Sequence, residues 1–236
     1  MNETDNIVFL PFNDESALEN VMNDSVCAVI IEGMQGVGGV QVPTDSFLQK
    51  AKSLCEKNNS VLILDEVQSG YGRSGKFFSH QFSNIKPDII TTAKGMGNGF
   101  PVGGVLINPR LPAKHHQLGT TFGGNHLACA AAIAVLNIIK NEKLMINAKG
   151  IGDYMISTLK KITGVKEVRG RGLMIGIELE FPYEAVRNEL IFTHRIFTGT
   201  SGKNTLRLLP PLTLSKEEAE IFLHAFASVM KKSLVK

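Results

Sequence analysis

The 236-residue sequence has few cysteines, and none of them are paired by spacing. Cys27, Cys55 and Cys129 are an odd number, and each lies in an apolar segment. This pattern excludes the disulfide framework of a small secreted domain. We expect all three residues to be reduced, buried thiols of a cytoplasmic protein.

Long apolar runs and a marked excess of charge are also lacking. No apolar stretch could cross a bilayer, and the start MNETDN has neither the charge nor the apolar segment of a signal peptide. The net charge of +3 is small and the basic residues are scattered, which argues against nucleic-acid binding. His115 and His116 have no third ligand at a recognisable spacing, so no metal site is predicted. An apolar content of 43% is typical of a soluble globular protein.

Residues 61–94 are the most informative part of the sequence. The run VLIL at 61–64 predicts a strand buried on both faces, and Asp65 follows directly. A second apolar run at 89–90 leads into a polar turn that carries Lys94 among glycines. Because ligands bind outside the carboxyl ends of strands in open α/β sheets, we expect Asp65 and Lys94 to face one crevice.

An acid and a lysine beside one ligand suit carbonyl chemistry. A lysine amine condenses with an aldehyde, and an aspartate can hold a pyridine nitrogen protonated, which makes the ring an electron sink. Pyridoxal phosphate has both the aldehyde and the ring. The spacing alone leaves an alternative open, in which Asp65 caps a turn and Lys94 is a solvated surface lysine.

The patterns before this stretch predict a βαβ unit. Residues 27–31 (CAVII) predict a strand that ends at Glu32, and Pro43 and Thr44 open a helix that runs to Lys57. With the strand at 61–64, this order implies a parallel sheet with a right-handed crossover. Asn13 is expected to cap a short helix nearer the start.

Three helices are predicted in the second half of the chain. Residues 126–140 are apolar nearly all round, which predicts a buried helix, and residues 142–162 continue as helix before strands around 165–180. Ser215 and Glu218 form a capping box for an amphipathic last helix. Its inward residues are expected to be Ile221, Phe222, Ala225, Phe226, Val229 and Met230.

Four motifs, in this order, resemble those of the class III pyridoxal-phosphate aminotransferases, and the nearest members are the acetylornithine and ornithine aminotransferases. The motifs are LILDEVQSGYGRSG, DIITTAKGMGNGFPVGG, HQLGTTFGGNHLACAAA and LRLLPPL. The resemblance implies an α/β fold of fold type I. Residues 1–140 would be the C-terminal portion of a large cofactor domain with a mostly parallel sheet, and residues 141–236 a small α+β domain. The family's N-terminal half has no counterpart here, so we expect a fragment or truncated product with an incomplete site.

The resemblance also assigns cofactor roles. Lys94 would bind the cofactor aldehyde and then move a proton, while Asp65 would hold the ring nitrogen. Val67 would pack against one ring face, and Gln68 would contact the phenolic oxygen. Thr121, in GTTFGGN, would reach the cofactor phosphate of a neighbouring subunit, which implies a homodimer.

Substrate roles fall on Arg207 and Glu32. Arg207 stands at the family's carboxylate clamp. Glu32 opens a motif that in the family reads Glu-Pro-apolar-Gln-Gly-Glu-Gly-Gly, and the resemblance gives it a substrate-binding role. The alternative is that Glu32 is a strand-end acid bonded to nearby backbone. Gly33 here replaces the proline. Val37 replaces the second glutamate, which pairs with the substrate-binding arginine in ornithine-type relatives, so the substrate assignment stays open.

The implied reaction is transfer of the terminal amine of N-acetylornithine, or of another acylated ornithine such as N-succinylornithine, to 2-oxoglutarate in arginine biosynthesis. The alternatives are an ornithine, 4-aminobutyrate or other ω-amino-acid aminotransferase, an aminomutase, against which Gln68 argues, and a catalytically incompetent remnant that dimerises without cofactor. Arg73 is interpreted as a surface or subunit-contact residue, and Arg171 as a surface residue.

Overall fold

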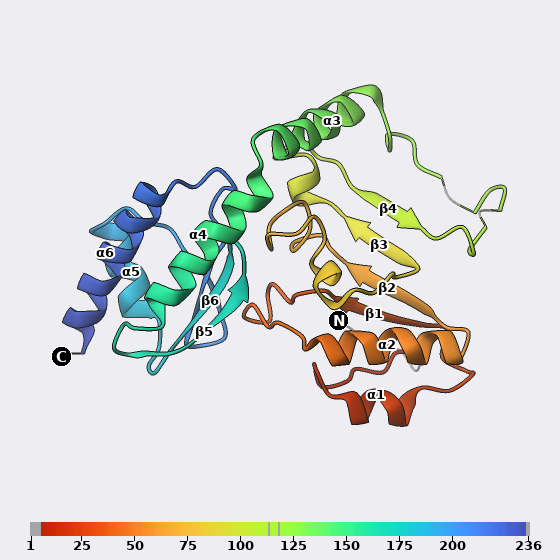
Figure 1. The fold of residues 1–236 in the computed structure, drawn as a ribbon, viewed down its shortest axis with the longest axis horizontal. Helices are drawn as coiled ribbons and strands as arrows, with labels where there is room; N and C mark the ends of the chain where they lie inside the picture. The colour runs from red at the N-terminus through yellow and green to blue at the C-terminus, as the bar shows by residue number, and fades with distance from the viewer. Residues whose placement is uncertain (1–5, 113, 118, 235–236) are drawn as a thin grey trace.

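Two four-stranded sheets, joined through two long helices, form the framework of the molecule (Figure 1). The structure is a computed structural model that describes residues 6–112, 114–117 and 119–234. The N-terminal sheet has the strand order β1-β2-β3-β4, and the C-terminal sheet has the order β5-β6-β8-β7. The division into domains at residue 140 stays a prediction.

The N-terminal sheet contains the predicted βαβ unit. Strands β1 (Ala28–Glu32), β2 (Val61–Asp65) and β3 (Ile89–Thr92) are parallel, and β4 (Gly104–Ile107) runs antiparallel to β3. Helix α2 (Asp45–Lys57) makes the crossover between β1 and β2. It begins as predicted, because the side chain of Thr44 accepts a hydrogen bond from the Phe47 amide.

Only one face of this sheet carries a helical layer within the described ranges. Leu62 and Leu64 are fully buried in a cluster with Leu48 and Ala51 of α2. Val61 and Ile63 alternate with them and are only partly buried. The prediction that β2 is buried on both faces was therefore wrong, because burial follows the helix layer and not the apolar run.

The first helix, α1 (Glu15–Val21), is capped by Asp14 rather than by Asn13. The Asp14 carboxylate accepts a hydrogen bond from the Ala17 amide. Asn13 has a φ of +66° and accepts a hydrogen bond from the Thr44 amide at 2.8 Å. The predicted cap is used instead to hold the start of α2.

Helices α3 (His126–Asn141) and α4 (Leu144–Leu159) connect the two sheets (Figure 1). The prediction of a buried α3 was wrong. Only Ala128, Ala132 and Ile139 of α3 are buried, whereas Leu127 is 72% exposed. The sequence pattern is that of a buried helix, but the part of the chain that the structure describes covers one side of it only.

The C-terminal sheet is antiparallel throughout and packs against helices. Its elements are β5 (Val165–Arg171), β6 (Met174–Leu179), α5 (Glu184–Phe192), β7 (Gly199–Ser201), β8 (Thr205–Leu208) and α6 (Lys216–Ser233). The capping box of Ser215 and Glu218 is confirmed. All predicted inward residues of α6 are buried except Ile221, which is 65% exposed.

The burial of the three cysteines differs from the prediction. Cys55 is buried as expected, but Cys27 and Cys129 are exposed, so the expectation of three buried thiols was wrong. Among the described helices, none combines the length and apolar character needed to span a bilayer. No group of three or more metal-ligating side chains occurs in the described ranges.

Candidate active site

The carboxyl ends of the parallel strands bring two acids and a lysine together. Glu32 and Asp65 are direct register partners at the ends of β1 and β2, and Lys94 lies in the turn after β3. Burial raises the pKa of the Glu32 carboxyl above its usual value. The Gly36 amide, donating at 2.9 Å, opposes this rise, the charge of Asp65 adds to it, and the charge of Lys94 opposes it. The predicted convergence on one edge of the sheet is present.

Lys94 is held in an uncommon backbone conformation. It opens the short 3₁₀ turn η2 (Lys94–Met96) with a φ of +46°, in the left-handed region that non-glycine residues seldom adopt. Its carbonyl accepts hydrogen bonds from the amides of Gly97 at 3.1 Å and Asn98 at 3.2 Å. The side chain is exposed rather than buried. Strained positions of this kind are concentrated at functional sites.

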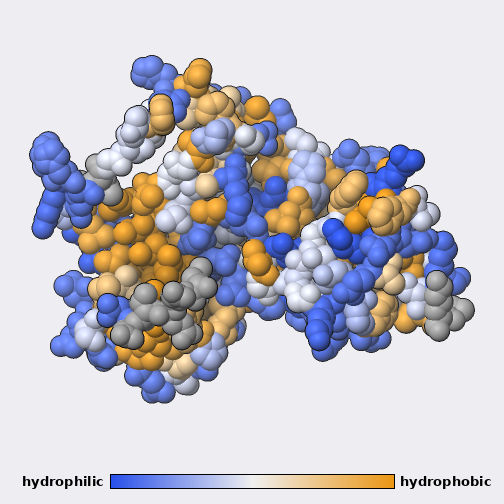
Figure 2. All heavy atoms as spheres, turned by 180° about the vertical axis from the view of Figure 1, so that it is seen from behind, coloured by the Kyte–Doolittle hydropathy of each residue, from blue (hydrophilic) through white to orange (hydrophobic). Residues whose placement is uncertain are grey.

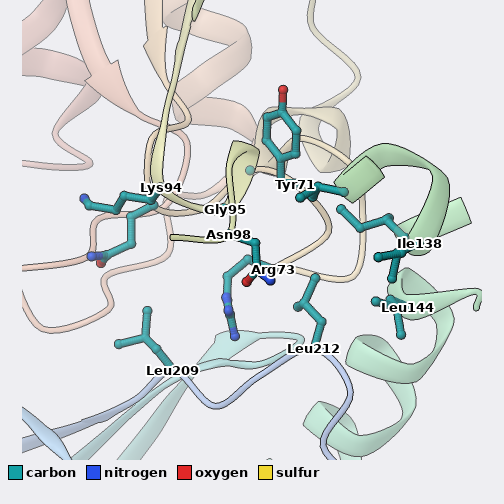
Figure 3. A pocket seen from close by; sticks show the side chains of 13 residues that line it. Tyr71, Arg73, Lys94, Gly95, Asn98, Ile138, Leu144, Leu209 and Leu212 are labelled. Atoms are coloured by element: carbon teal, nitrogen blue, oxygen red, sulfur yellow. The ribbon is translucent and has the colours of Figure 1, made fainter. Parts of the chain in front are cut away.

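A cavity of about 220 Å³ lies beside Lys94 (Figure 3). Residues from the segments after β2 and β3, from α3 and from the segment after β8 line it, including Gln68, Arg73, Ile138 and Leu209. The cavity therefore lies where the two halves of the molecule meet. Sequence reasoning did not identify the part contributed by α3, since only the packing of that helix brings it there.

Gln68 presents an unused polar group in this cavity. Its Oε1 atom is buried and has no hydrogen-bond partner among the described residues. Gly36 lies against it, since a methyl group at that position would lie 1.6 Å from Gln68 Oε1 and would displace the Gln68 side chain. The unpaired atom is a hydrogen-bond acceptor beside the backbone of Gly36. Leaving such a buried group unpaired costs roughly 1–3 kcal/mol.

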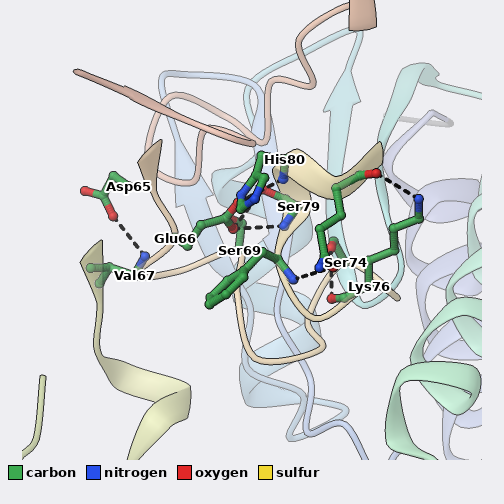
Figure 4. Close-up of polar contacts among 10 residues, drawn as sticks. Asp65, Glu66, Val67, Ser69, Ser74, Lys76, Ser79 and His80 are labelled. Carbon is green, nitrogen blue, oxygen red and sulfur yellow. Dashed lines mark hydrogen bonds and ion pairs between the residues drawn. The ribbon is translucent and has the colours of Figure 1, made fainter. Parts of the chain in front are cut away.

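Behind the strand ends lies a buried hydrogen-bond network centred on Glu66 (Figure 4). Glu66 accepts hydrogen bonds from the hydroxyls of Ser69 and Ser79 and from the amides of Ser79 and His80, and His80 Nδ1 lies 2.8 Å from Glu66 Oε1. Burial would raise the pKa of Glu66, but these hydrogen bonds outweigh it and hold the pKa below its usual value. This network was not predicted from the sequence, where no spacing signals it.

The network also explains Gly33, which departs from the family motif. A methyl group at Gly33 would lie 2.2 Å from Ser79 Oγ and 2.8 Å from Glu66 Oε1. Only glycine leaves room for the Glu66 carboxylate and the Ser79 hydroxyl at that point. The departure is therefore a packing adaptation behind the site.

Arg73 joins the two halves of the molecule. Its Nη1 donates hydrogen bonds to the carbonyls of Leu173, at 3.3 Å, and Pro210, and its own carbonyl accepts one from the Leu173 amide at 3.0 Å. Burial lowers the pKa of the Arg73 guanidinium to about 10. Figure 3 shows the side chain extending toward the segment with Leu209 and Leu212. The interpretation of Arg73 as a surface residue was wrong, because its bonding partners come from distant parts of the chain, and a subunit contact stays a prediction.

Arg207 lies on β8 with part of its guanidinium unpaired. Its Nε donates to the Thr200 carbonyl at 2.9 Å, whereas its Nη1 is buried and has no partner within the described ranges. Arg207 lines a second cavity of about 330 Å³, and Leu209 lines both cavities. Arg207 is thus adjacent to the Lys94 cavity and not inside it.

Val37 lies near Arg207, on the loop after β1. Its side chain is 72% exposed, and its carbonyl accepts a hydrogen bond at 2.7 Å from Ser201, the residue after Thr200. The loop therefore contacts β7, the strand that also binds Arg207. Since Val37 replaces a glutamate, Arg207 has no carboxylate partner from this position.

Two further predicted residues lie outside the cavities. Thr121 is exposed in the segment between β4 and α3 and lines neither cavity. Arg171 pairs with Asp45 at 3.5 Å and stacks over the Phe82 ring at 4.4 Å. Arg171 therefore supports the contact between the two halves and does not approach the site.

The fold is that of the fold-type-I pyridoxal-phosphate enzymes. The family model described as "Aminotransferase class-III" matches residues 8–230. The chain therefore belongs to the class III aminotransferase family, whose members use pyridoxal phosphate. The expectation drawn from the four motifs is confirmed.

Individual relatives agree with this assignment. The acetylornithine aminotransferase of Methanosarcina mazei is 37% identical over 90% of this chain and 54% of its own length. That of Methanothermobacter thermautotrophicus is 39% identical over 89% of this chain and 55% of its own length. The structure of ornithine aminotransferase from Plasmodium yoelii superposes with a TM-score of 0.88 at 35% identity, covering 94% of this chain and 62% of its own. The chain thus spans about half the length of the curated relatives it matches.

Proposed function

We propose that this chain carries the C-terminal part of an aminotransferase that moves the terminal amino group of N-acetylornithine, or of another N-acylornithine such as N-succinylornithine, to 2-oxoglutarate. The observation that carries the proposal is the grouping of Glu32, Asp65 and Lys94 at one sheet edge beside the unpaired amide of Gln68. Several relatives at 36–41% identity are acetylornithine aminotransferases, which supports arginine biosynthesis as the pathway.

The residues present fit one edge of pyridoxal phosphate. When bound, the cofactor supplies an aldehyde for covalent attachment and a ring that accepts the electron pair released at the substrate carbon. Asp65 would keep the ring nitrogen protonated, and Val67, whose amide donates to Asp65 at 2.9 Å, would contact one ring face. Gln68 would donate a hydrogen bond from Nε2 to the phenolic oxygen. The orphaned Gln68 atom and the Gly36 gap beside it support this fit.

Lys94 would act twice. Its amine would hold the cofactor through the aldehyde and, when free, would move a proton at the substrate carbon. The exposed side chain leaves the amine free for both tasks. The turn held by the Gly97 and Asn98 amides supports a fixed position for its Cα atom.

Arg207 would bind the substrate carboxylate. A guanidinium offers two parallel donors to a carboxylate, and the buried Nη1 of Arg207 is a donor without an acceptor in the described part of the chain. Glu32, half-buried at the opposite side of the strand ends, would contact the substrate near the ring.

Val37 favours an acylated amino donor over free ornithine. A free α-ammonium held next to Arg207 would place two cations together, and Val37 supplies no negative charge to offset them. An acylated α-amine is neutral and avoids this repulsion. Ornithine and 4-aminobutyrate aminotransferases remain the second candidates, and the relative in Staphylococcus saprophyticus, 37% identical over 96% of this chain, is an ornithine aminotransferase.

A homodimer and a cytoplasmic location belong to the same proposal. Thr121 lies in an exposed segment away from the cavities of its own chain, so it would serve the phosphate of a neighbouring subunit. Closed twofold dimers are the commonest form of soluble oligomer.

The test is the visible spectrum of the purified chain with added pyridoxal phosphate, alongside Lys94→Ala. We expect a yellow band that Lys94→Ala abolishes and that N-acetylornithine bleaches faster than ornithine does. Bleaching by ornithine alone would favour the second candidate. Absence of a band in both proteins would indicate a chain that does not act as an aminotransferase by itself, as the incompetent-remnant alternative holds.

A further inference from the structure

Arg73 carries a charge that no described side chain neutralises. Its Nη1 donates to the carbonyls of Leu173 and Pro210, but its Nε and Nη2 donate to no described residue. The ion pairs that other arginines form with acids have no counterpart at Arg73 in the described ranges. Carbonyls are neutral dipoles, and a guanidinium away from water is stabilised best by an opposite charge that also accepts its hydrogen bonds. Arg73 therefore has two nitrogen atoms that suit an anion.

Burial without a neighbouring acid also shows in the acid–base behaviour of Arg73. Burial alone lowers the pKa of its guanidinium to about 10, and no carboxylate of the described chain lies close enough to raise it again. Arg110 shows the opposite case, because its hydrogen bond to Asp88 raises its pKa. The two arginines differ in whether an acid accompanies them.

The cavity of about 220 Å³ brings Arg73 within reach of a ligand. Lys94 and Asn98 line the same cavity, and none of its described lining residues is an aspartate or a glutamate. Figure 3 shows Arg73 among Asn98, Leu209 and Leu212. Two cations and no acid give the cavity a positive potential, which favours a ligand with negative charge.

Most of the remaining lining is apolar. Figure 2 shows a similar mixture from outside, with hydrophilic and hydrophobic residues interspersed where the two halves meet. An inorganic anion would leave the apolar side chains against water, whereas a carboxylate with a hydrocarbon chain covers them. These side chains come from α3, from the start of α4 and from the segment after β8, and they are Val135, Ile138, Ile139, Leu144, Leu209 and Leu212.

The volume of the cavity limits the length of that chain. A water molecule occupies about 30 Å³ in the liquid, so a cavity of about 220 Å³ holds roughly seven groups of that size. A carboxylate with about four or five carbon atoms in all has this number of non-hydrogen atoms. The cavity therefore matches a short aliphatic acid and not a bulky one.

This cavity is a different space from the position proposed for the cofactor. Glu32, Asp65 and Val67 do not line it, although Gln68 and Lys94 do. Its walls come from both halves of the molecule, because α3 and the segment after β8 both contribute. A ligand in the cavity would contact both halves at once.

We propose that this cavity binds a short aliphatic carboxylate, whose two oxygens accept hydrogen bonds from Nε and Nη2 of Arg73 and whose hydrocarbon chain packs against α3 and Leu212. One edge of a guanidinium presents two parallel N–H groups, which match the two oxygens of a carboxylate. The proposal does not rest on the proposed function, since it requires neither cofactor nor turnover.

The test is isothermal titration calorimetry of the full chain with valerate, without added cofactor. We expect one site per chain. Arg73→Gln should weaken binding at least about tenfold, because it removes the charge that holds the carboxylate. Ile138→Asp should do the same, because it places a negative charge in the cavity wall and leaves the Arg73 hydrogen bonds in place.

Ile133→Asp is the matched control. It adds the same charge to the same helix, at a residue that is 58% exposed and does not line the cavity, so valerate binding should stay unchanged. Unchanged far-ultraviolet circular dichroism would show that the variants fold. If Arg73→Gln does not fold, the comparison of Ile138→Asp with Ile133→Asp decides.

Two further ligands separate the charge from the hydrocarbon chain. Pentanamide has nearly the shape of valerate without its charge, and inorganic phosphate has charge without a chain, so each should bind at least about tenfold more weakly than valerate. The proposal would be overturned by any of four results. They are no saturable binding of valerate, unchanged affinity in Arg73→Gln or Ile138→Asp, an equal loss in Ile133→Asp, and binding of pentanamide or phosphate as tight as that of valerate.

Discussion

Asp88 is expected to supply a measurable, acid-sensitive part of the stability of the N-terminal sheet. Its side chain is 1% exposed and accepts hydrogen bonds from the Leu62 amide at 2.9 Å and from Arg110 Nε at 2.6 Å. The Arg110 hydrogen bond, followed by the Leu62 amide and the charge of Lys52, lowers the pKa of Asp88 from 3.8 to about 2 despite burial. Asp88 thus ties β2 to the segment after β4.

The size of the Asp88 contribution to stability follows from the thermodynamic linkage between protonation and folding. A difference of nearly two pKa units between unfolded and folded states corresponds to roughly 2 kcal/mol of stability. Because the folded pKa is the lower one, this contribution is fully present above pH 3.8 and is lost as the pH falls toward 2. Asp88→Asn should therefore be about 2 kcal/mol less stable than the unmodified chain at pH 7, and the difference should shrink as the pH falls through this window.

Urea unfolding from pH 7 to pH 2 provides the measurement. Comparison with Asp88→Asn at each pH removes the contributions of other acids, such as Glu66 and Glu178, whose pKa values also lie below their usual range. Two stability curves that stay parallel down to pH 2 would refute the reasoning, because the carboxylate would then have the same pKa in both states.

Two other substitutions test the contact between the halves and the shape of the site. Arg73→Ala removes two hydrogen bonds to carbonyls and should lower the free energy of unfolding, measured by urea titration, by roughly 1–3 kcal/mol. The control is Arg171→Ala, which should lower it less because the partners of Arg171 are exposed or aromatic. Equal losses in the two variants would contradict the role given to Arg73. Gly36→Ala places a methyl group 1.6 Å from Gln68 Oε1 and should displace that side chain. The affinity for pyridoxal phosphate, measured by absorbance, should fall at least about tenfold relative to the control Gly150→Ala, where nothing lies within 4 Å of the added methyl group. Similar affinities for both variants would show that Gln68 does not contact the cofactor.

Local patterns in the sequence were sufficient for several elements. The Ser215–Glu218 pair caps its helix as predicted, and the helix predicted to open at Pro43 and Thr44 begins at Asp45, since both signals depend on residues a few positions apart. The order of strand, helix and strand implied a parallel sheet, and this placed Glu32, Asp65 and Lys94 at one edge. The four motifs identified the family because they are short and contiguous.

Contacts between distant segments were decided by the tertiary structure alone. The partners of Arg73 lie 100 and 137 residues away, and the space that Gly33 leaves is filled by Ser79 and Glu66, so no local spacing signals either contact. Burial likewise depends on which layer covers an element. The apolar sequences of α3 and β2 indicate that both should be buried, but only the packing shows that Leu127 and Ile30 have no cover from the described chain. Hydrophobicity is a property of the residue, and burial is a property of its neighbours.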